Sequence, residues 1–161
     1  LGDKAKSGIR KHWEHVEADT GQAFDYGFFE RDDFIYNSEQ PSNAVVAVRN
    51  ANLNSLYFLE ALQSAFYQKN LDITSEAVLT KIAEEVGLDA PSFATELTSA
   101  ATLEDANKDY ELTKKLGIQG FPTLLGMANN KIQLLTMGYQ PYEAIAQKIE
   151  TWQNNIDTKD E

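Results

Sequence analysis

The chain has 161 residues, of which 42% are apolar and 24% are charged, and this composition is typical of a folded globular protein. Its formal net charge of −11 disfavours binding to the phosphate backbone of nucleic acids, and no apolar run approaches the roughly 20 residues that a membrane-spanning helix needs. Cysteine is absent, which excludes a disulfide, a thiolate metal site and a cysteine nucleophile within these residues.

The N-terminal part of the chain begins with a helical pattern. Ile9, Trp13 and Val16 recur at i, i+4 and i+7 and predict a helix over residues 3–18. Residues 23–38 then crowd aromatic side chains into an acidic stretch that has no helical period. We expect this stretch to be a loop or a short extended segment that is anchored by its aromatic rings.

Five more helices are expected before residue 117. Pro41 suits the first turn of a helix, because its missing N–H needs no partner there. Thr102 to Asp105 resembles a capping box, so Thr102 is the predicted N-cap of the last of these helices. The expected helices begin near Pro41, span 55–69, run from Ser75 to Gly87, run from Asp89 past Leu97, and run from Thr102 to Leu116.

The pattern changes after Gly117. Two short apolar segments, 123–128 and 131–137, predict strands, and the Asn129-Asn130 pair between them suits a two-residue hairpin turn. A final helix is expected over 141–155, with an apolar stripe made of Tyr142, Ile145, Ile149 and Trp152. Because so apolar a hairpin is marginal by itself in water, we expect it to join a larger sheet whose other strands are mostly absent from this chain.

The most specific segment is Gly117-Ile118-Gln119-Gly120-Phe121-Pro122-Thr123. A helix, this glycine-rich G-x-P-T segment, a hairpin and a terminal helix resemble the second half of the thioredoxin fold. With the long helical stretch before it, the chain resembles the DsbA family. The segments that resemble the FrnE-like branch of that family are 11–16, 20–24, 33–38, 43–47, 65–67, 72–74 and 138–141.

The resemblance implies an α/β fold, mostly α in this chain: a thioredoxin-like fold with a helical insertion and with the N-terminal β-α-β unit missing. Residues 1–161 would form a partial DsbA-like domain. Its helical part would span 1–116, and the cis-proline loop, hairpin and C-terminal helix would span 117–156. The chain begins without an initiator methionine, and the missing unit is expected upstream of Leu1.

The resemblance also implies thiol–disulfide oxidoreductase or isomerase activity. In the family, the catalytic C-x-x-C motif stands in the β-α-β unit, so no catalytic residue is expected in this chain, which should be inactive alone. Pro122 would be the family's cis-proline, and Phe121, Pro122 and Thr123 would form the substrate-binding platform. The implied partner is a thiol- or disulfide-containing protein or peptide, with glutathione and a homodimer as further alternatives. No cofactor, metal, nucleic acid or membrane is expected.

Two other functions stay open. The chain could belong to a redox-dead module that holds an extended peptide against the platform, or to a relative of the kappa-type glutathione transferases and isomerases. The residue at the start of the absent first helix separates the three: C-x-x-C for redox chemistry, serine for glutathione chemistry, neither for binding alone. The expected location is cytoplasmic, or periplasmic if a signal precedes the chain.

Three sets of side chains offer other chemistry, and each has a simpler structural explanation. His12 and His15 are three residues apart on a helix, as two metal ligands would be, but only glutamates stand nearby as further ligands. Glu30, Asp32 and Asp33 could act as acid and base, although acidic surface loops are common. We therefore expect neither set to be a site.

The third set is aromatic. Phe28, Phe29 and Phe34 could line an apolar pocket or anchor the core, and we expect the core. Ser42 stands near a position where family members often have a cysteine. Three serines lie outside the position that matches the catalytic nucleophile, namely Ser7, Ser38 and Ser42.

Overall fold

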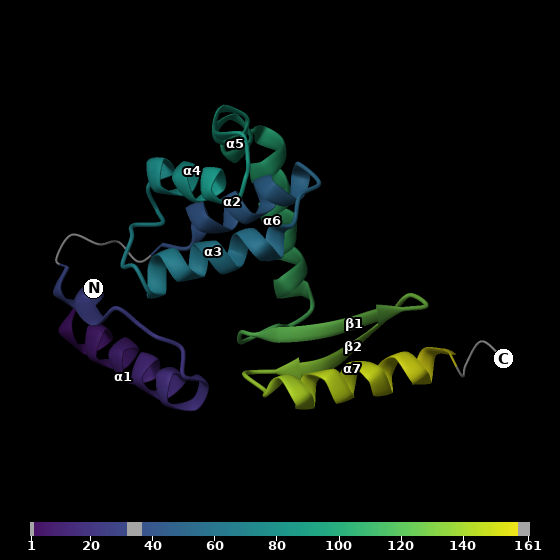
Figure 1. The fold of residues 1–161 in the computed structure, drawn as a ribbon. Coiled ribbons are helices and arrows are strands. Elements are labelled where there is room, and N and C mark those ends of the chain that lie inside the picture. Colours follow the sequence, from purple (N-terminus) through teal and green to yellow (C-terminus); the bar gives the residue numbers. More distant parts are fainter. Residues whose placement is uncertain (1, 32–36, 158–161) are drawn as a thin grey trace. The chain divides into compact units, whose positions relative to one another are not determined.

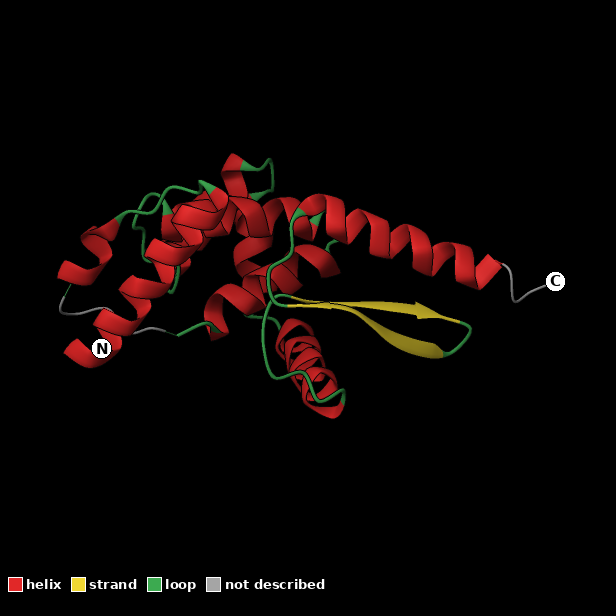
Figure 2. Ribbon diagram, turned by 90° about the horizontal axis from the view of Figure 1, so that it is seen from below, coloured by secondary structure: helices red, strands yellow, loops and turns green. Residues whose placement is uncertain are grey.

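The computed structural model describes residues 2–31 and 37–157, which form seven α-helices, one 3-10 helix and one hairpin (Figure 1, Figure 2). The elements are α1 (Asp3–Thr20), the 3-10 helix η1 (Tyr26–Glu30), α2 (Glu39–Asn50), α3 (Ser55–Tyr67), α4 (Glu76–Glu85), α5 (Ala90–Leu97), α6 (Ala100–Lys115), β1 (Thr123–Ala128), β2 (Lys131–Met137) and α7 (Tyr142–Asp157). The chain divides into two compact units, Leu1–Asp109 and Tyr110–Glu161. Among the described helices, none is long and apolar enough to cross a membrane.

The first unit has a main core between α2, α3, α4 and α5. Apolar residues at helical spacing bring one face of each helix inward, and Phe58 and Leu79 are fully buried at the centre. The expected helix positions are therefore confirmed. The buried members of this core are Ala44, Ala47, Val48, Phe58, Leu62, Ala65, Leu79, Ile82, Ala83, Phe93 and Leu97.

A second core surrounds Trp13 of α1. The Trp13 ring contacts Phe28 and Phe29 of η1 and Phe66 of α3, with ring centroids 4.9–6.0 Å apart. Asp25 begins η1 by accepting a hydrogen bond from the Gly27 N–H at 2.8 Å. The expected loop is thus partly a 3-10 helix, because packing against Trp13 fixes this segment even though its sequence has no helical period.

The predicted N-cap of α6 is wrong. The helix begins at Ala100, and Ser99 accepts a hydrogen bond from the Thr102 N–H at 3.1 Å, so Ser99 is in the capping position. Thr102 lies inside the helix and is fully buried. Its hydroxyl donates to Glu96 Oε1 at 2.7 Å, and this bond to α5 takes the side chain away from the backbone.

The second unit begins at Tyr110, within α6, and contains the end of that helix, the hairpin and α7. β1 and β2 pair antiparallel, and Asn129 and Asn130 have φ values of 50° and 57°, as the predicted two-residue turn requires. Helix α7 packs on one face of this sheet, and the Trp152 ring lies directly against Gly126. Tyr142 is 78% exposed, so the stripe that covers the sheet begins at Ile145 and not at Tyr142.

Candidate functional site

The segment between α6 and β1 is a tight loop with its own hydrogen bonds. Gly117 ends α6 with φ of 69°, a left-handed conformation that glycine adopts without strain. The Thr123 hydroxyl donates to the Gly120 carbonyl at 2.7 Å, and the Gly138 N–H donates to the Pro122 carbonyl at 2.8 Å. The loop is therefore held both within itself and to the end of β2.

The three predicted platform residues lie together at the start of β1. The Phe121–Pro122 peptide bond is cis, the isomer that the family resemblance implies. The Phe121 side chain is 79% exposed, whereas Thr123 is half-buried and pairs with Met137 of β2. This arrangement places an exposed aromatic ring beside the start of β1, which is held in place by its pairing with β2.

The edge of β1 that faces away from β2 could bind another strand. Within the described part of the chain the sheet has two strands, so β1 pairs on one side only. Backbone N–H and C=O groups along such an edge can hydrogen-bond an extended peptide, as in strand addition. The loop and this edge together can hold a peptide backbone, but the chain supplies no thiol for redox chemistry.

The two histidines of α1 are both exposed, and His15 Nε2 lies 3.3 Å from Asp19 Oδ2 on the same helix. In residues 2–31 and 37–157, no cluster of three or more histidine, aspartate or glutamate side chains is placed to hold a metal ion. His12 and His15 therefore lie on a solvated helix face.

The structure describes only some of the other candidate residues. Glu30 is exposed at the end of η1, whereas Asp32, Asp33 and Phe34 lie outside the described residues. Phe28 and Phe29 are buried in the cluster around Trp13, as expected for core anchors.

Two carboxylates have pKa values shifted by helix ends and ion pairs. Hydrogen bonds from the Ser92 hydroxyl and N–H, at 2.5 and 3.0 Å, lower the pKa of Asp89, the N-cap of α5. A hydrogen bond from Lys108 Nζ lowers the pKa of Asp105. Both shifts follow from local helix structure, so they do not indicate catalytic groups.

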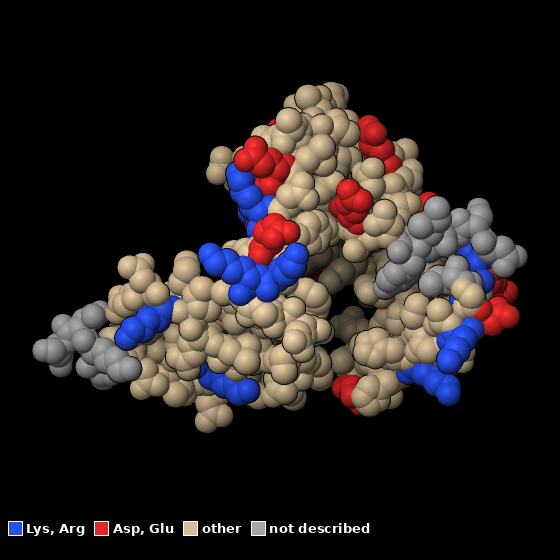
Figure 3. Space-filling view, turned by 180° about the vertical axis from the view of Figure 1, so that it is seen from behind, with Lys and Arg blue, Asp and Glu red and all other residues tan. Residues whose placement is uncertain are grey.

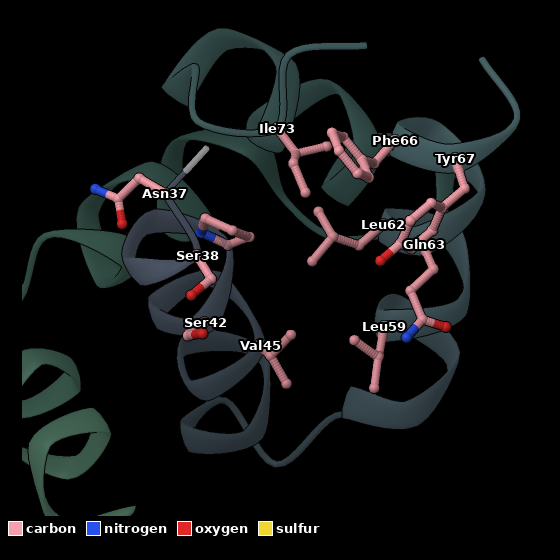
Figure 4. A pocket seen from close by; sticks show the side chains of 11 residues that line it. Asn37, Ser38, Ser42, Val45, Leu59, Leu62, Gln63, Phe66, Tyr67 and Ile73 are labelled. Carbon is pink, nitrogen blue, oxygen red and sulfur yellow. The ribbon is translucent and has the colours of Figure 1, made fainter. Parts of the chain in front are cut away.

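Sequence reasoning missed a cavity between α2 and α3, with a volume of about 220 Å³ (Figure 4). The sequence contains a signal for it. Ser42 and Val45 lie on one face of α2, just after Ser38, and Leu59, Leu62 and Phe66 lie on the facing side of α3. Their spacing gives the direction of each side chain but not the distance between the helices.

Charge does not mark a further site on the face drawn in Figure 3. There, among the described residues, Lys, Arg, Asp and Glu side chains are interspersed with uncharged ones, without a continuous basic strip.

Solved structures similar to this one include proteins described as disulfide enzymes. A provisionally assigned protein disulfide isomerase from Nitrosomonas europaea superimposes with a TM-score of 0.92 at 29% identity, covering 96% of this chain and 76% of its own. The cytosolic disulfide reductase DsbM from Pseudomonas aeruginosa gives a TM-score of 0.79 at 25% identity, covering 92% and 77%. DsbM has also been solved with GSH, and that structure gives a TM-score of 0.71.

Curated relatives, of which the chain covers a smaller share, are named as adapters. The ClpXP adapter protein SpxH from Bacillus subtilis is 26% identical over 121 residues, which are 72% of this chain and 40% of SpxH. The chain thus spans less than half the length of the curated relatives it matches. The thioredoxin family model matches residues 27–147, about three quarters of the chain. The chain therefore belongs to the thioredoxin family, with the thioredoxin-like fold and inserted helices of its DsbA-like members.

Proposed function

We propose that this chain is the substrate-binding part of a DsbA-type thiol–disulfide oxidoreductase or isomerase. The observation that carries the proposal is the loop at Phe121–Thr123, which has an exposed aromatic ring and is held by two hydrogen bonds. Its similarity to a disulfide isomerase and a disulfide reductase supports the same conclusion.

In this proposal residues 1–161 form one partial domain. Residues 1–116 are its helical part, and residues 117–156 carry the cis-proline loop, the hairpin and α7. A β-α-β unit upstream of Leu1 supplies the catalytic C-x-x-C motif and further strands of the sheet. The working protein is cytoplasmic, as DsbM is described to be, and its partner is a protein or peptide with thiols or disulfides.

The platform is tested with an unfolded, cysteine-blocked peptide titrated into the chain while backbone amide signals are followed by NMR. We expect saturable shifts at Phe121 and Thr123 and along β1, because the peptide adds there as a strand. Phe121→Ala should weaken binding, whereas Tyr142→Ala is the matched control, since both rings are exposed and belong to the second unit. Equal losses from both variants, or shifts spread over α7, would contradict the platform.

The redox part of the proposal is tested separately in the longer protein that includes this chain. We expect insulin reduction that disappears when the upstream cysteines are replaced by serine, while peptide binding at Phe121 persists. Loss of both would indicate a folding defect, and a longer protein without a C-x-x-C motif would contradict redox chemistry alone.

A binding-only function is the second candidate, and the curated relatives that are named as adapters favour it. The SpxH relatives are named as adapters, so a protein of this kind can serve by holding another polypeptide. Peptide binding at the platform by a longer protein without redox activity would select this candidate. Glutathione is the third: the DsbM structure with GSH supports a thiol peptide of that size as ligand, and the same amide signals would report it.

A further inference from the structure

The cavity between α2 and α3 lies entirely within the first unit and is independent of the platform described above. It is lined by Asn37, Ser38, Pro41, Ser42, Val45, Leu59, Leu62, Gln63, Phe66, Tyr67 and Ile73. Pro41, Leu62 and Phe66 are buried at its base, whereas Asn37, Ser38 and Gln63 are exposed at its rim. The space therefore has an apolar interior and a polar mouth.

Figure 4 shows how these side chains are arranged. Ser42 of α2 and Ser38, which directly precedes α2, lie on one side, and Gln63 of α3 lies on the other. Val45, Leu59 and Ile73 stand around the space between the two helices. An occupant would thus meet hydrocarbon along its length and hydroxyl or amide groups at one end.

The cavity has the size and polarity of a small-molecule site. Its volume of about 220 Å³ exceeds the ~150 Å³ of an apolar cavity that is known to admit benzene. No Asp, Glu, Lys or Arg is among the described residues that line it, although acidic and basic residues make up 24% of the chain. A charged ligand would lose its hydration there without gaining an ionic partner among the described lining residues, so this part of the lining favours a neutral ligand.

We propose that this cavity binds a small uncharged molecule with an apolar body of about one aromatic ring and one hydrogen-bonding group. The ring would displace water from the surface formed by Val45, Leu59 and Leu62, which is favourable in proportion to the apolar area buried. The polar group would be directed to the mouth, where Ser38, Ser42 and Gln63 offer hydroxyl and amide partners.

The test uses the full chain and two probes of equal size, benzyl alcohol and benzoate. Methyl signals of Val45, Leu59, Leu62 and Ile73 are followed by NMR during each titration. We expect saturable shifts of these methyls with benzyl alcohol and at least tenfold weaker binding of benzoate. The methyls of Leu56 and Leu112, which are exposed and do not line the cavity, should stay in place.

Two variants locate the probe. Val45→Phe places a ring in the cavity and should weaken benzyl alcohol binding at least tenfold, whereas Leu56→Phe adds the same ring on the exposed side of α3 and should leave it unchanged. If Val45→Phe fails to fold, the methyl shifts of the unsubstituted chain still show whether the probe binds in the cavity. Equal affinity for both probes, equal shifts at Leu56 and Leu112, or no saturation up to the solubility limit would overturn the proposal.

Discussion

The lack of a side chain at Gly126 determines how closely α7 packs on β1. A Cβ atom at this position would lie 2.5 Å from Trp152 Cε2, closer than real Cβ contacts allow. The glycine therefore lets the Trp152 ring pack flat on β1, and α7 lies close to the sheet.

Gly126→Ala should destabilise the second unit by about 1–3 kcal/mol, because an added methyl group forces the ring or the strand to move. Trp152 fluorescence during urea unfolding measures the effect. Gly120→Ala is the matched control in the same unit, since a Cβ there has no neighbour within 4 Å. Similar losses in the two variants would show that the Trp152 contact is not the cause.

Thr102 does not cap α6, and its hydroxyl forms a buried hydrogen bond instead. Its hydroxyl and that of Ser99 both donate to Glu96 Oε1, at 2.7 and 3.1 Å. Thr102→Val should cost about 1–3 kcal/mol of stability, because the shape is kept while the buried bond to Glu96 is lost. Thr98→Val, on an exposed position at the end of α5, is the control for a β-branched substitution. A denaturation midpoint that does not move would show that the hydroxyl contributes nothing.

Asp89 should make the stability of α5 depend on pH. Its pKa is lowered in the folded chain by Ser92, so its contribution is present above the unfolded pKa and is lost as pH falls through the folded pKa. Asp89→Asn keeps an N-cap but removes the charge. We expect the melting temperature of the native chain, measured relative to this variant, to fall as pH drops from 6 to 3. A constant difference would contradict the assignment.

At the scale of elements, the hairpin has one covered and one open face. The Gly126–Gln133 pair is on the side of α7, so the neighbouring Met127–Ile132 pair is on the opposite side, where both residues are exposed. With the unpaired edge of β1, this surface can associate with another copy or with further strands of a longer chain.

The isolated chain should therefore self-associate, and Ile132→Lys should shift it towards the monomer by placing a charge on the open face. Sedimentation at several concentrations measures this, with Gln153→Lys on the exposed side of α7 as the control for added charge. A native chain that stays monomeric and melts cooperatively would show that the edge and the open face do not recruit a copy.

At the scale of the whole molecule, these 161 residues contain no cysteine, and thiol–disulfide exchange requires a thiolate. We expect no insulin reduction and no isomerisation of scrambled ribonuclease by the purified chain. Turnover above the buffer blank, once contaminating enzymes are excluded by mass spectrometry, would contradict this.

The sequence by itself determined the helices and the hairpin, because apolar spacing, proline and left-handed Asn or Gly residues act over a few neighbours. The expectation for the loop at Phe121–Thr123 came from the resemblance of its motif to the DsbA family. Only the tertiary structure decided that Ser99 caps α6, that Tyr142 stays exposed, and that α2 and α3 leave a cavity between them. Each of these outcomes depends on groups that lie elsewhere in the fold. The Thr102 hydroxyl bonds to Glu96 on the preceding helix, so Ser99 takes the capping position. Tyr142 is exposed because the part of α7 that covers the sheet begins after it, and the cavity exists because of the separation between α2 and α3. Local patterns give the direction of a side chain, whereas the distance to its partner is set only when the elements pack.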